Sequence, residues 1–265
     1  EEYFNIHLTY GGPHIGIYPE ETLELPFVDS VIAGDGEIPL LRLCTFLAND
    51  DEDPHFPGLH LKESGFRNGH DAFYIQENLD DLPIPDRTFL DLEKYSSVLS
   101  KTDFVTTMIS SRGCPYKCTF CKLNFQKTLQ QSADRVIDEF KRISDLGIRE
   151  VEIYDDTFTW SKERVMEICH GLIEADIKLE WSVRDRVSSA DLEMYQLMYR
   201  AGCRRIHLGI ESGTQKVIDR MRKNIKVEDA KKAVNYAKQA GMTVLTYFMF
   251  GNLDETLEDM QKTID

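Results

Sequence analysis

The chain has 265 residues, a length typical of one large domain or of one domain with an added segment. Its 46 acidic and 31 basic residues give a net charge of −15, which repels a phosphate backbone and argues against nucleic-acid binding. No apolar run reaches the roughly 18–20 residues that span a bilayer, and Glu1 and Glu2 stand where a secretory signal carries basic residues. The absence of a starting Met indicates a piece of a longer protein.

Residues 1–48 have the pattern of the C-terminal part of an α/β domain. Strands are expected at residues 4–8 and 28–33, and apolar residues recur at helical spacing over residues 40–47. Residues 49–100 are predicted to be a connector, because four prolines interrupt regular structure there. Its aromatic residues need burial, so we expect an ordered segment.

The rest of the chain, residues 101–265, alternates strand and helix patterns. Four of the expected helices begin at a capping residue, in chain order Ser132, Ser161, Ser189 and, for the last helix, Asp254, and two further helices are expected near residues 217–221 and 230–240. The expected strands are residues 104–109, 151–154, 179–183, 205–209 and 243–250. Five consecutive βα units predict a parallel sheet that curls into a partial TIM-like barrel.

Polar residues cluster just after these strands. In such folds the chemistry lies beyond the carboxyl ends of the strands, so all of these clusters are expected on one face. They comprise Cys114, Cys118 and Cys121, Asp155 and Asp156, residues 184–186, Glu211 and Ser212, and residues 251–252.

The three clustered cysteines have the spacing C-x3-C-x2-C in a loop after the first strand of the barrel. Three thiolates can bind three irons of a cubane cluster, which leaves one iron with an open coordination position, whereas an ordinary 4Fe–4S site has four cysteines. A zinc site would need a fourth Cys or His nearby, and His70 and His170 are distant in sequence. An electron-transfer ferredoxin site and a redox thiol pair are further alternatives.

The isolated cysteines, Cys44, Cys169 and Cys203, are expected to be buried thiols. Cysteines gathered at one site, rather than spread as in a disulfide framework, are typical of a reducing compartment, so a cytoplasmic location is expected.

On the C-x3-C-x2-C segment, with an aromatic residue before the last Cys, residues 104–265 resemble the radical S-adenosylmethionine superfamily. The resemblance implies a 4Fe–4S cluster on the three cysteines that transfers one electron to the sulfonium of bound S-adenosylmethionine. It implies cleavage to methionine and a 5′-deoxyadenosyl radical, which takes a hydrogen atom from a substrate. An electron donor such as flavodoxin or ferredoxin is implied as a partner.

The resemblance also implies ligand-binding residues by their position. Phe120 is expected near the adenine, Asp155 and Asp156 near the methionine amino group, and Arg184 near the methionine carboxylate. The alternatives are loop packing for Phe120, helix N-terminal charge for the two acids and a surface ion pair for Arg184.

Two later strands carry further candidates. Glu211 and Ser212, in a Gly-Ile-Glu-Ser-Gly sequence, are expected near the ribose and methionine, or else form a turn and cap. Tyr247, Met249 and Phe250 either contact the adenine or belong to the barrel core. Relatives often carry Gly-x-Pro-Gly-Glu-Thr after this strand, whereas this chain lacks the proline and second glycine, and a sixth strand is missing from it.

The first 48 residues narrow the resemblance to the subfamily with a Rossmann-like cobalamin-binding domain. The sequences Gly-Gly-Pro-His ending at His14, Ala-Gly-Asp-Gly-Glu ending at Glu37, and residues 79–87 resemble the end of that domain and its bridge. Cobalamin is therefore an expected cofactor, with His14 near the corrin or capping a turn. An Asp-x-His-x-x-Gly lower-ligand sequence does not occur in the chain.

The resulting expectation is a radical enzyme that transfers a methyl group to an unactivated centre of an unidentified small molecule or peptide. Cobalamin-independent rearrangement or ring formation, and a non-catalytic module that holds zinc, remain as alternatives.

Overall fold

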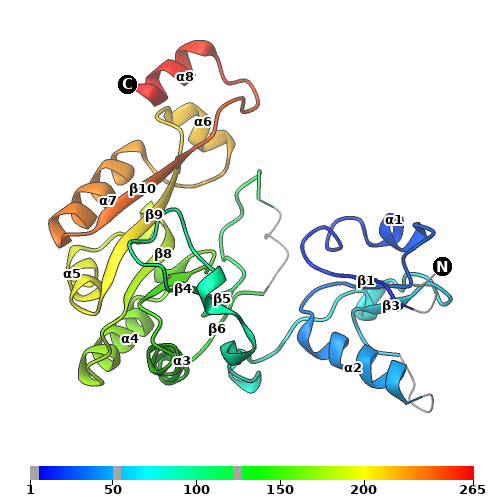
Figure 1. The fold of residues 1–265 in the computed structure, drawn as a ribbon. Coiled ribbons are helices and arrows are strands. Elements are labelled where there is room, and N and C mark those ends of the chain that lie inside the picture. Colours follow the sequence, from blue (N-terminus) through cyan, green and yellow to red (C-terminus); the bar gives the residue numbers. More distant parts are fainter. Residues whose placement is uncertain (1–5, 50–54, 122–126) are drawn as a thin grey trace. The chain divides into compact units, whose positions relative to one another are not determined.

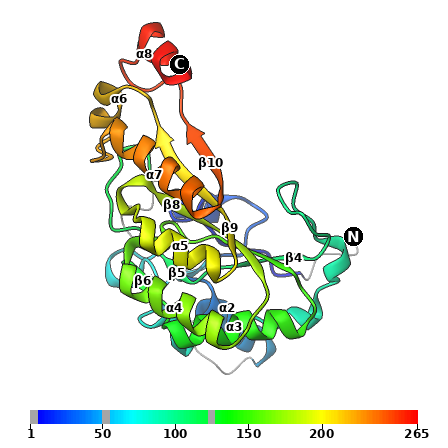
Figure 2. The ribbon, with the colours of Figure 1, turned by 90° about the vertical axis from the view of Figure 1, so that its left-hand side faces the viewer.

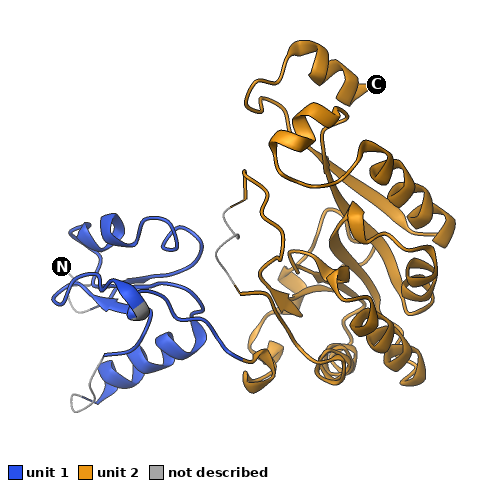
Figure 3. Cartoon of the chain, turned by 180° about the vertical axis from the view of Figure 1, so that it is seen from behind, with its two compact units in different colours: residues 1–77 blue, residues 78–265 orange. Residues whose placement is uncertain are grey.

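The computed structural model describes residues 6–49, 55–121 and 127–265. The chain divides into two compact units, residues 1–77 and residues 78–265 (Figure 3). The predicted connector is thus shared, with its first part in unit 1 and its second part in unit 2. No helix in the described part of the chain is long and apolar enough to span a membrane.

Unit 1 is a small α/β assembly. Parallel strands β1 (Thr9–Tyr10) and β2 (Ser30–Ile32) are joined by antiparallel β3 (Leu59–Leu61), in the order β1-β2-β3. Helices α1 (Pro19–Glu24) and α2 (Glu37–Ala48) accompany them (Figure 1). The first expected strand, residues 4–8, lies partly outside the described residues. The unit has two small apolar clusters, one that contains Val28 and Val31 and one that contains Leu43.

Unit 2 contains a five-stranded parallel sheet in the order β10-β9-β8-β7-β4 among the described residues (Figure 1). The α/β partial barrel predicted from the strand and helix alternation is therefore confirmed. The strands are β4 (Val105–Met108), β7 (Glu150–Ile153), β8 (Glu180–Arg186), β9 (Cys203–Glu211) and β10 (Thr243–Phe248).

The helices between the strands cover one face of this sheet. Figure 2 shows α3, α4, α5 and α7 side by side along it, and consecutive members of this series are in contact. The helices of unit 2 are α3 (Ala133–Asp145), α4 (Lys162–Glu174), α5 (Leu192–Arg200), α6 (Gln215–Arg220), α7 (Val227–Ala240) and α8 (Leu257–Ile264).

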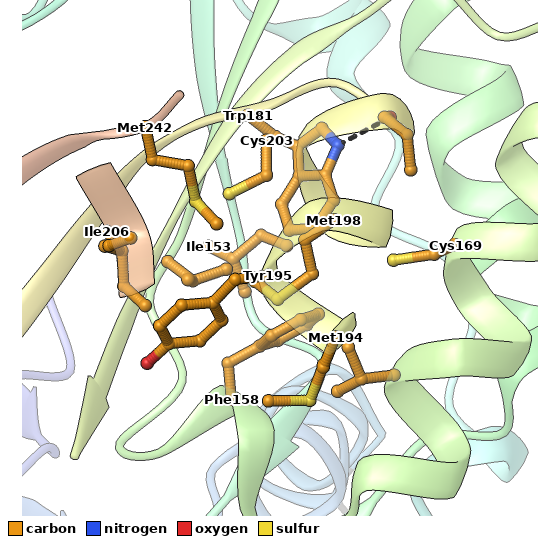
Figure 4. Close-up of a cluster of buried hydrophobic side chains, with 14 of the residues drawn as sticks. Ile153, Phe158, Cys169, Trp181, Met194, Tyr195, Met198, Cys203, Ile206 and Met242 are labelled. Atoms are coloured by element: carbon orange, nitrogen blue, oxygen red, sulfur yellow. Dashed lines mark hydrogen bonds between the residues drawn. The ribbon is translucent and has the colours of Figure 1, made fainter. Parts of the chain in front are cut away.

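The main hydrophobic core lies between the sheet and these helices (Figure 4). Trp181 of β8 is almost fully buried, packs edge-on against Phe140 of α3, and donates a hydrogen bond of 2.9 Å to the carbonyl of Ala201. Cys169 and Cys203 are buried in this core, as predicted. Cys44 is exposed instead, because α2 turns the adjacent Leu43 inward.

Two of the four predicted helix caps are wrong. Ser132 and Ser161 cap α3 and α4 as expected. However, Ser189 ends a short 3-10 turn, and the side chain of Asp191 caps α5 by accepting from the amide of Met194 at 2.8 Å. The last helix is capped by Thr256 rather than Asp254, since Thr256 and Asp259 form a reciprocal capping box.

Candidate functional site

The cysteine segment is the loop of a small hairpin beyond the carboxyl end of β4. Strand β5 (Ser111–Arg112) pairs antiparallel with β6 (Leu129–Gln130), so the two ends of the cysteine loop lie side by side. Gly113 turns the chain into the loop with a φ of +76°, and a Cβ there would lie 2.7 Å from the carbonyl oxygen of Lys127. A side chain is therefore excluded by both conformation and space.

Asp155 anchors the base of this hairpin. Its fully buried carboxylate accepts hydrogen bonds from the amide of Ser110 at 2.6 Å, from the Ser110 hydroxyl at 2.6 Å and from the amide of Ser111 at 2.9 Å. Burial raises the pKa of Asp155, and the three donors oppose that rise. Arg164 of α4 supports the same strands through the carbonyl oxygens of Ser110, at 2.9 Å, and Gln131, at 2.7 Å.

This arrangement separates the two acids that were predicted to bind the methionine amino group. Asp155 has no exposed surface and its oxygens already accept three hydrogen bonds, so the structure gives it a positioning role. Asp156 is exposed and its carboxylate accepts from the backbone of Gly113, next to Cys114. Of the pair, only Asp156 remains open to a ligand.

The three predicted cluster ligands lie on this hairpin. Cys118 is buried, whereas Cys114 and Cys121 are partly exposed, and none of the six cysteines forms a disulfide. The Cys114 sulfur lies 3.5 Å from the hydroxyl of Thr157, which follows β7. The amide of Cys121 donates to the carbonyl of Cys118 at 3.1 Å, which folds the last two cysteines into one turn.

Arg186, at the end of β8, contacts the same loop; the sequence placed it in a polar cluster on the catalytic face but gave it no ligand role. Its Nη1 donates to the sulfur of Cys118 at 3.4 Å, and its guanidinium carbon lies 3.9 Å from the centre of the Tyr116 ring. The sequence contained a signal for it: Arg184 and Arg186 have the same parity along a strand and therefore face the same side of the sheet.

Arg184 itself lies deeper along the strand. Its guanidinium stacks on the ring of Tyr154 at 3.5 Å from the centroid, and its Nη1 donates to the carbonyl of Ile153 at 3.4 Å. Neither contact is the surface ion pair that was the alternative. The side chain stays partly exposed, so it remains a candidate for the methionine carboxylate.

Glu211, the last residue of β9, forms a buried ion pair near the cysteine loop. Its Oε1 lies 2.7 Å from the ammonium of Lys223, which in turn lies 5.8 Å from the centre of the Phe120 ring. Glu211 adopts a φ of +73°, a strained conformation for a residue with a side chain. The amide of Thr119 donates to the carbonyl of Met221 at 2.9 Å, which fastens the loop to the end of α6.

Phe120 is itself 44% exposed, so its ring is available to a ligand. Ser212 differs, because it is fully buried and its hydroxyl lies 3.2 Å from that of Thr263 in α8 and accepts from the amide of Thr214 at 3.1 Å. The turn-and-cap alternative thus describes Ser212 in this structure.

The face of the sheet opposite the helices carries a polar network. Register aligns Arg184 with His207 and His207 with Leu245 across three strands. His207 lies 2.7 Å from the Tyr247 hydroxyl and accepts from Arg205 at 3.1 Å, while Arg205 pairs with Glu150 and Glu152. Desolvation by burial, then the charges of Arg184 and Arg205, lower the pKa of His207 to about 4. Tyr247 therefore belongs to this network, whereas Met249 and Phe250 lie beyond the end of β10.

In unit 1, His14 lies in an exposed turn after β1, with its ring 5.6 Å from that of Tyr18. The residue is exposed, and its carbonyl accepts from the amides of Ile17 at 2.9 Å and Tyr18 at 3.0 Å within this turn, so the corrin contact stays a prediction. Among the described residues, no group of three His, Cys, Asp or Glu side chains converges on a single metal ion. The thiolates of a cubane bind three separate irons, so convergence on one point is not required of them.

Comparison with known proteins identifies the family. The model of the Radical SAM superfamily matches residues 108–265. An uncharacterized methyltransferase of Pyrococcus horikoshii is 33% identical over 267 residues, covering 98% of this chain and 57% of the relative. The chain belongs to the radical SAM superfamily. Cytidylyl-2-hydroxyethylphosphonate methyltransferase of Streptomyces wedmorensis is 28% identical, over 96% of the chain and 55% of that enzyme.

Solved structures of radical SAM enzymes share the fold of both units. The cobalamin-dependent S-adenosylmethionine radical enzyme OxsB aligns with a TM-score of 0.79 at 22% identity, over 97% of this chain and 38% of OxsB. The radical S-adenosylmethionine methyltransferase TsrM of Kitasatospora setae aligns with a TM-score of 0.76 at 19% identity, over 97% and 52%. The chain spans about half the length of the curated relatives it matches.

Family membership confirms the predicted enzyme class, the 4Fe–4S cluster and S-adenosylmethionine as its cofactor. The residues present fit the cluster, because one loop carries three thiols and a buried guanidinium contacts one of them. The individual ligand assignments remain predictions.

Proposed function

We propose that this chain carries the catalytic core of a cobalamin-dependent radical SAM methyltransferase acting on an unactivated centre. The observation that carries the proposal is the anchored hairpin, which presents Cys114, Cys118 and Cys121 at the carboxyl ends of the barrel strands. The bound cluster supplies one electron to S-adenosylmethionine. The methyltransferase names of the two relatives support methyl transfer.

The side chains around the hairpin suit a zwitterionic ligand beside the cluster. Asp156 offers a carboxylate for an ammonium, and Arg184 offers a guanidinium for a carboxylate, the pairing that such groups prefer. Phe120 offers an exposed aromatic face near Lys223, which suits an adenine ring. The side chain of Glu211 is fixed by its ion pair with Lys223. The backbone carbonyl of Glu211 accepts from the amide of Met249 at 2.8 Å, which links the end of β9 to the residue just after β10.

Cobalamin binding is proposed for unit 1. Its support is the likeness of its fold to OxsB and TsrM, both solved with cobalamin bound, together with the exposed His14 turn. The proposed domain boundaries are residues 1–48 for the end of the cobalamin-binding domain, residues 49–100 for a connector whose first part belongs to unit 1 and whose second part belongs to unit 2, and residues 101–265 for the barrel. The thiol site requires a reducing compartment, which supports a cytoplasmic location and a flavodoxin or ferredoxin as electron donor.

Anaerobic reconstitution of the full-length protein with iron and sulfide tests this proposal. The reduced protein should form 5′-deoxyadenosine from S-adenosylmethionine, and Cys118→Ala should lose cluster and turnover together. Cys203→Ala is the matched control, because that thiol is buried in the core away from the hairpin. Absence of 5′-deoxyadenosine from a cluster-bearing wild-type protein would reject the proposal.

Ring formation is the second candidate. Anaerobic magnesium-protoporphyrin IX monomethyl ester cyclase of Rubrivivax gelatinosus is 26% identical over 96% of the chain. Isotopically labelled methylcobalamin separates the two reactions, because label enters the product only if the methyl group is transferred.

A further inference from the structure

Arg186 is a buried cation that faces a predicted cluster ligand. Only 5% of its surface is exposed, and three contacts fix its guanidinium. Nη1 donates to the Cys118 sulfur at 3.4 Å, Nε donates to the hydroxyl of Ser188 at 3.1 Å, and the plane lies 3.9 Å from the Tyr116 ring centre. Two of these three partners belong to the cysteine loop, so Arg186 ties β8 to it.

In the part of the chain that the structure describes, Arg186 lacks the ion-paired carboxylate that three other buried cations of unit 2 have; Arg164, which also forms no ion pair, lies near enough to Asp155 for that carboxylate to favour its charge. Arg87 pairs with Glu139 at 2.7 Å, Arg205 with Glu150 and Glu152, and Lys223 with Glu211. Within the described ranges, no carboxylate lies within ion-pair distance of Arg186. An uncompensated buried charge is unfavourable, so this position calls for an anion that the protein's carboxylates do not provide. The thiolates of the loop and the cluster they hold are the anions next to it.

We propose that Arg186 is a positioning residue that sets the reduction potential of the cluster. The inference rests on the proposed function, because it requires a cluster on Cys118. Reduction adds one electron, and therefore one negative charge, to the cluster. A fixed positive charge and a hydrogen bond to a ligand sulfur stabilise the reduced form, which makes the potential less negative. The electron comes from the external donor and remains on the cluster, so no bond is formed or broken in this step.

The test is a potentiometric measurement, followed by EPR, on full-length protein reconstituted anaerobically without S-adenosylmethionine. Omitting that ligand removes any contribution from binding of its carboxylate. Arg186→Met removes the charge and the donor, Arg186→Gln removes the charge alone, and Arg186→Lys keeps the charge but loses the planar guanidinium. Arg204→Met is the control, since it removes a cation that pairs with Glu180 and stacks on Tyr199.

We expect Arg186→Met to lower the equilibrium constant for cluster reduction about tenfold, which is 59 mV for a one-electron couple. Arg186→Gln should shift the potential in the same direction, Arg186→Lys should shift it less, and Arg204→Met should leave it unchanged. If Arg186→Met does not assemble a cluster, Arg186→Gln gives the decisive value.

An unchanged potential in a cluster-bearing Arg186→Met or Arg186→Gln protein would overturn the inference while leaving the proposed function intact. A wild-type protein that binds no iron and sulfide would instead reject the proposed function. Iron and sulfide content, measured for every variant, distinguishes these two failures.

Discussion

Replacing Asp155 with Ala should destabilise unit 2 severely, because this one carboxylate satisfies three donors at the base of the hairpin. The amides of Ser110 and Ser111 would be left buried without an acceptor, at about 1–3 kcal/mol each. The Ser110 hydroxyl can rotate toward another acceptor and adds less. The expected loss is therefore about 3–5 kcal/mol, a large fraction of a typical domain stability of about 5–15 kcal/mol.

Asp155→Asn is the matched variant. Its amide oxygen can accept from both backbone amides, and its NH₂ group can donate to the Ser110 oxygen, so we expect a loss within about 1 kcal/mol. Asp138→Ala, which removes an exposed helical ion pair with Arg142, should cost about 0.5 kcal/mol or less.

Denaturant unfolding followed by tryptophan fluorescence measures these differences, because both tryptophans, Trp160 and Trp181, belong to unit 2. Equal stability of Asp155→Ala and Asp138→Ala would refute this account of the hairpin. So would a loss in Asp155→Asn as large as that in Asp155→Ala, since the hydrogen bonds would then not be the cause.

Three further predictions concern the same unit. Gly113→Ala should lower iron incorporation several-fold, because its φ of +76° and the carbonyl of Lys127 exclude a side chain, whereas Gly36→Ala, with no atom within 4 Å, should not. Lys223→Met should cost about 3–5 kcal/mol of unfolding free energy by leaving Glu211 buried and unpaired, and adding Glu211→Gln should recover part of it. Burial raises the pKa of Asp185 to about 6, so its folded form holds a proton that the unfolded chain has lost, and stability falls as pH rises from about 4 to 6. The lowered pKa of His207 has the opposite effect, because the unfolded chain holds a proton that the folded form has lost, and stability rises as pH rises from about 4 to 6.5. Asp185→Asn removes the falling contribution, so the unfolding free energy should rise more steeply with pH between 4 and 6 than in the wild type. An unchanged slope would contradict this prediction.

The alternation of strands and helices could be predicted because it depends on local periodicity. Helix α3 shows this well, since its apolar residues recur at helical spacing and Ser132 caps it. The location of the cysteines at the carboxyl end of β4 follows from the same pattern. The cap of α5 was misplaced because Ser189 and Asp191 are both good capping residues, and only the tertiary position of the 3-10 turn distinguishes them.

The roles of the site residues depend on contacts that sequence spacing does not specify. Sequence spacing does not separate Asp155 from Asp156, because both follow the end of β7 and only the contacts of Asp155 with Ser110 and Ser111 show that it is the buried one. Parity could not separate Arg184 from Arg186, which face the same side. Arg186 reaches the sulfur of Cys118 because of the position of the cysteine loop over the barrel, which is a tertiary feature. The contact of Ser212 could not be predicted because its partner, Thr263, is 51 residues away in α8.

The central claim is that Cys114, Cys118 and Cys121 hold a 4Fe–4S cluster with one open iron. Metal and sulfide analysis of anaerobically reconstituted full-length protein, combined with EPR of the reduced state with and without S-adenosylmethionine, tests it most directly. The account predicts about four irons and four sulfides per chain, and an EPR spectrum that changes when S-adenosylmethionine binds. Stoichiometric zinc without iron or sulfide, or a cluster whose spectrum ignores S-adenosylmethionine, would contradict it.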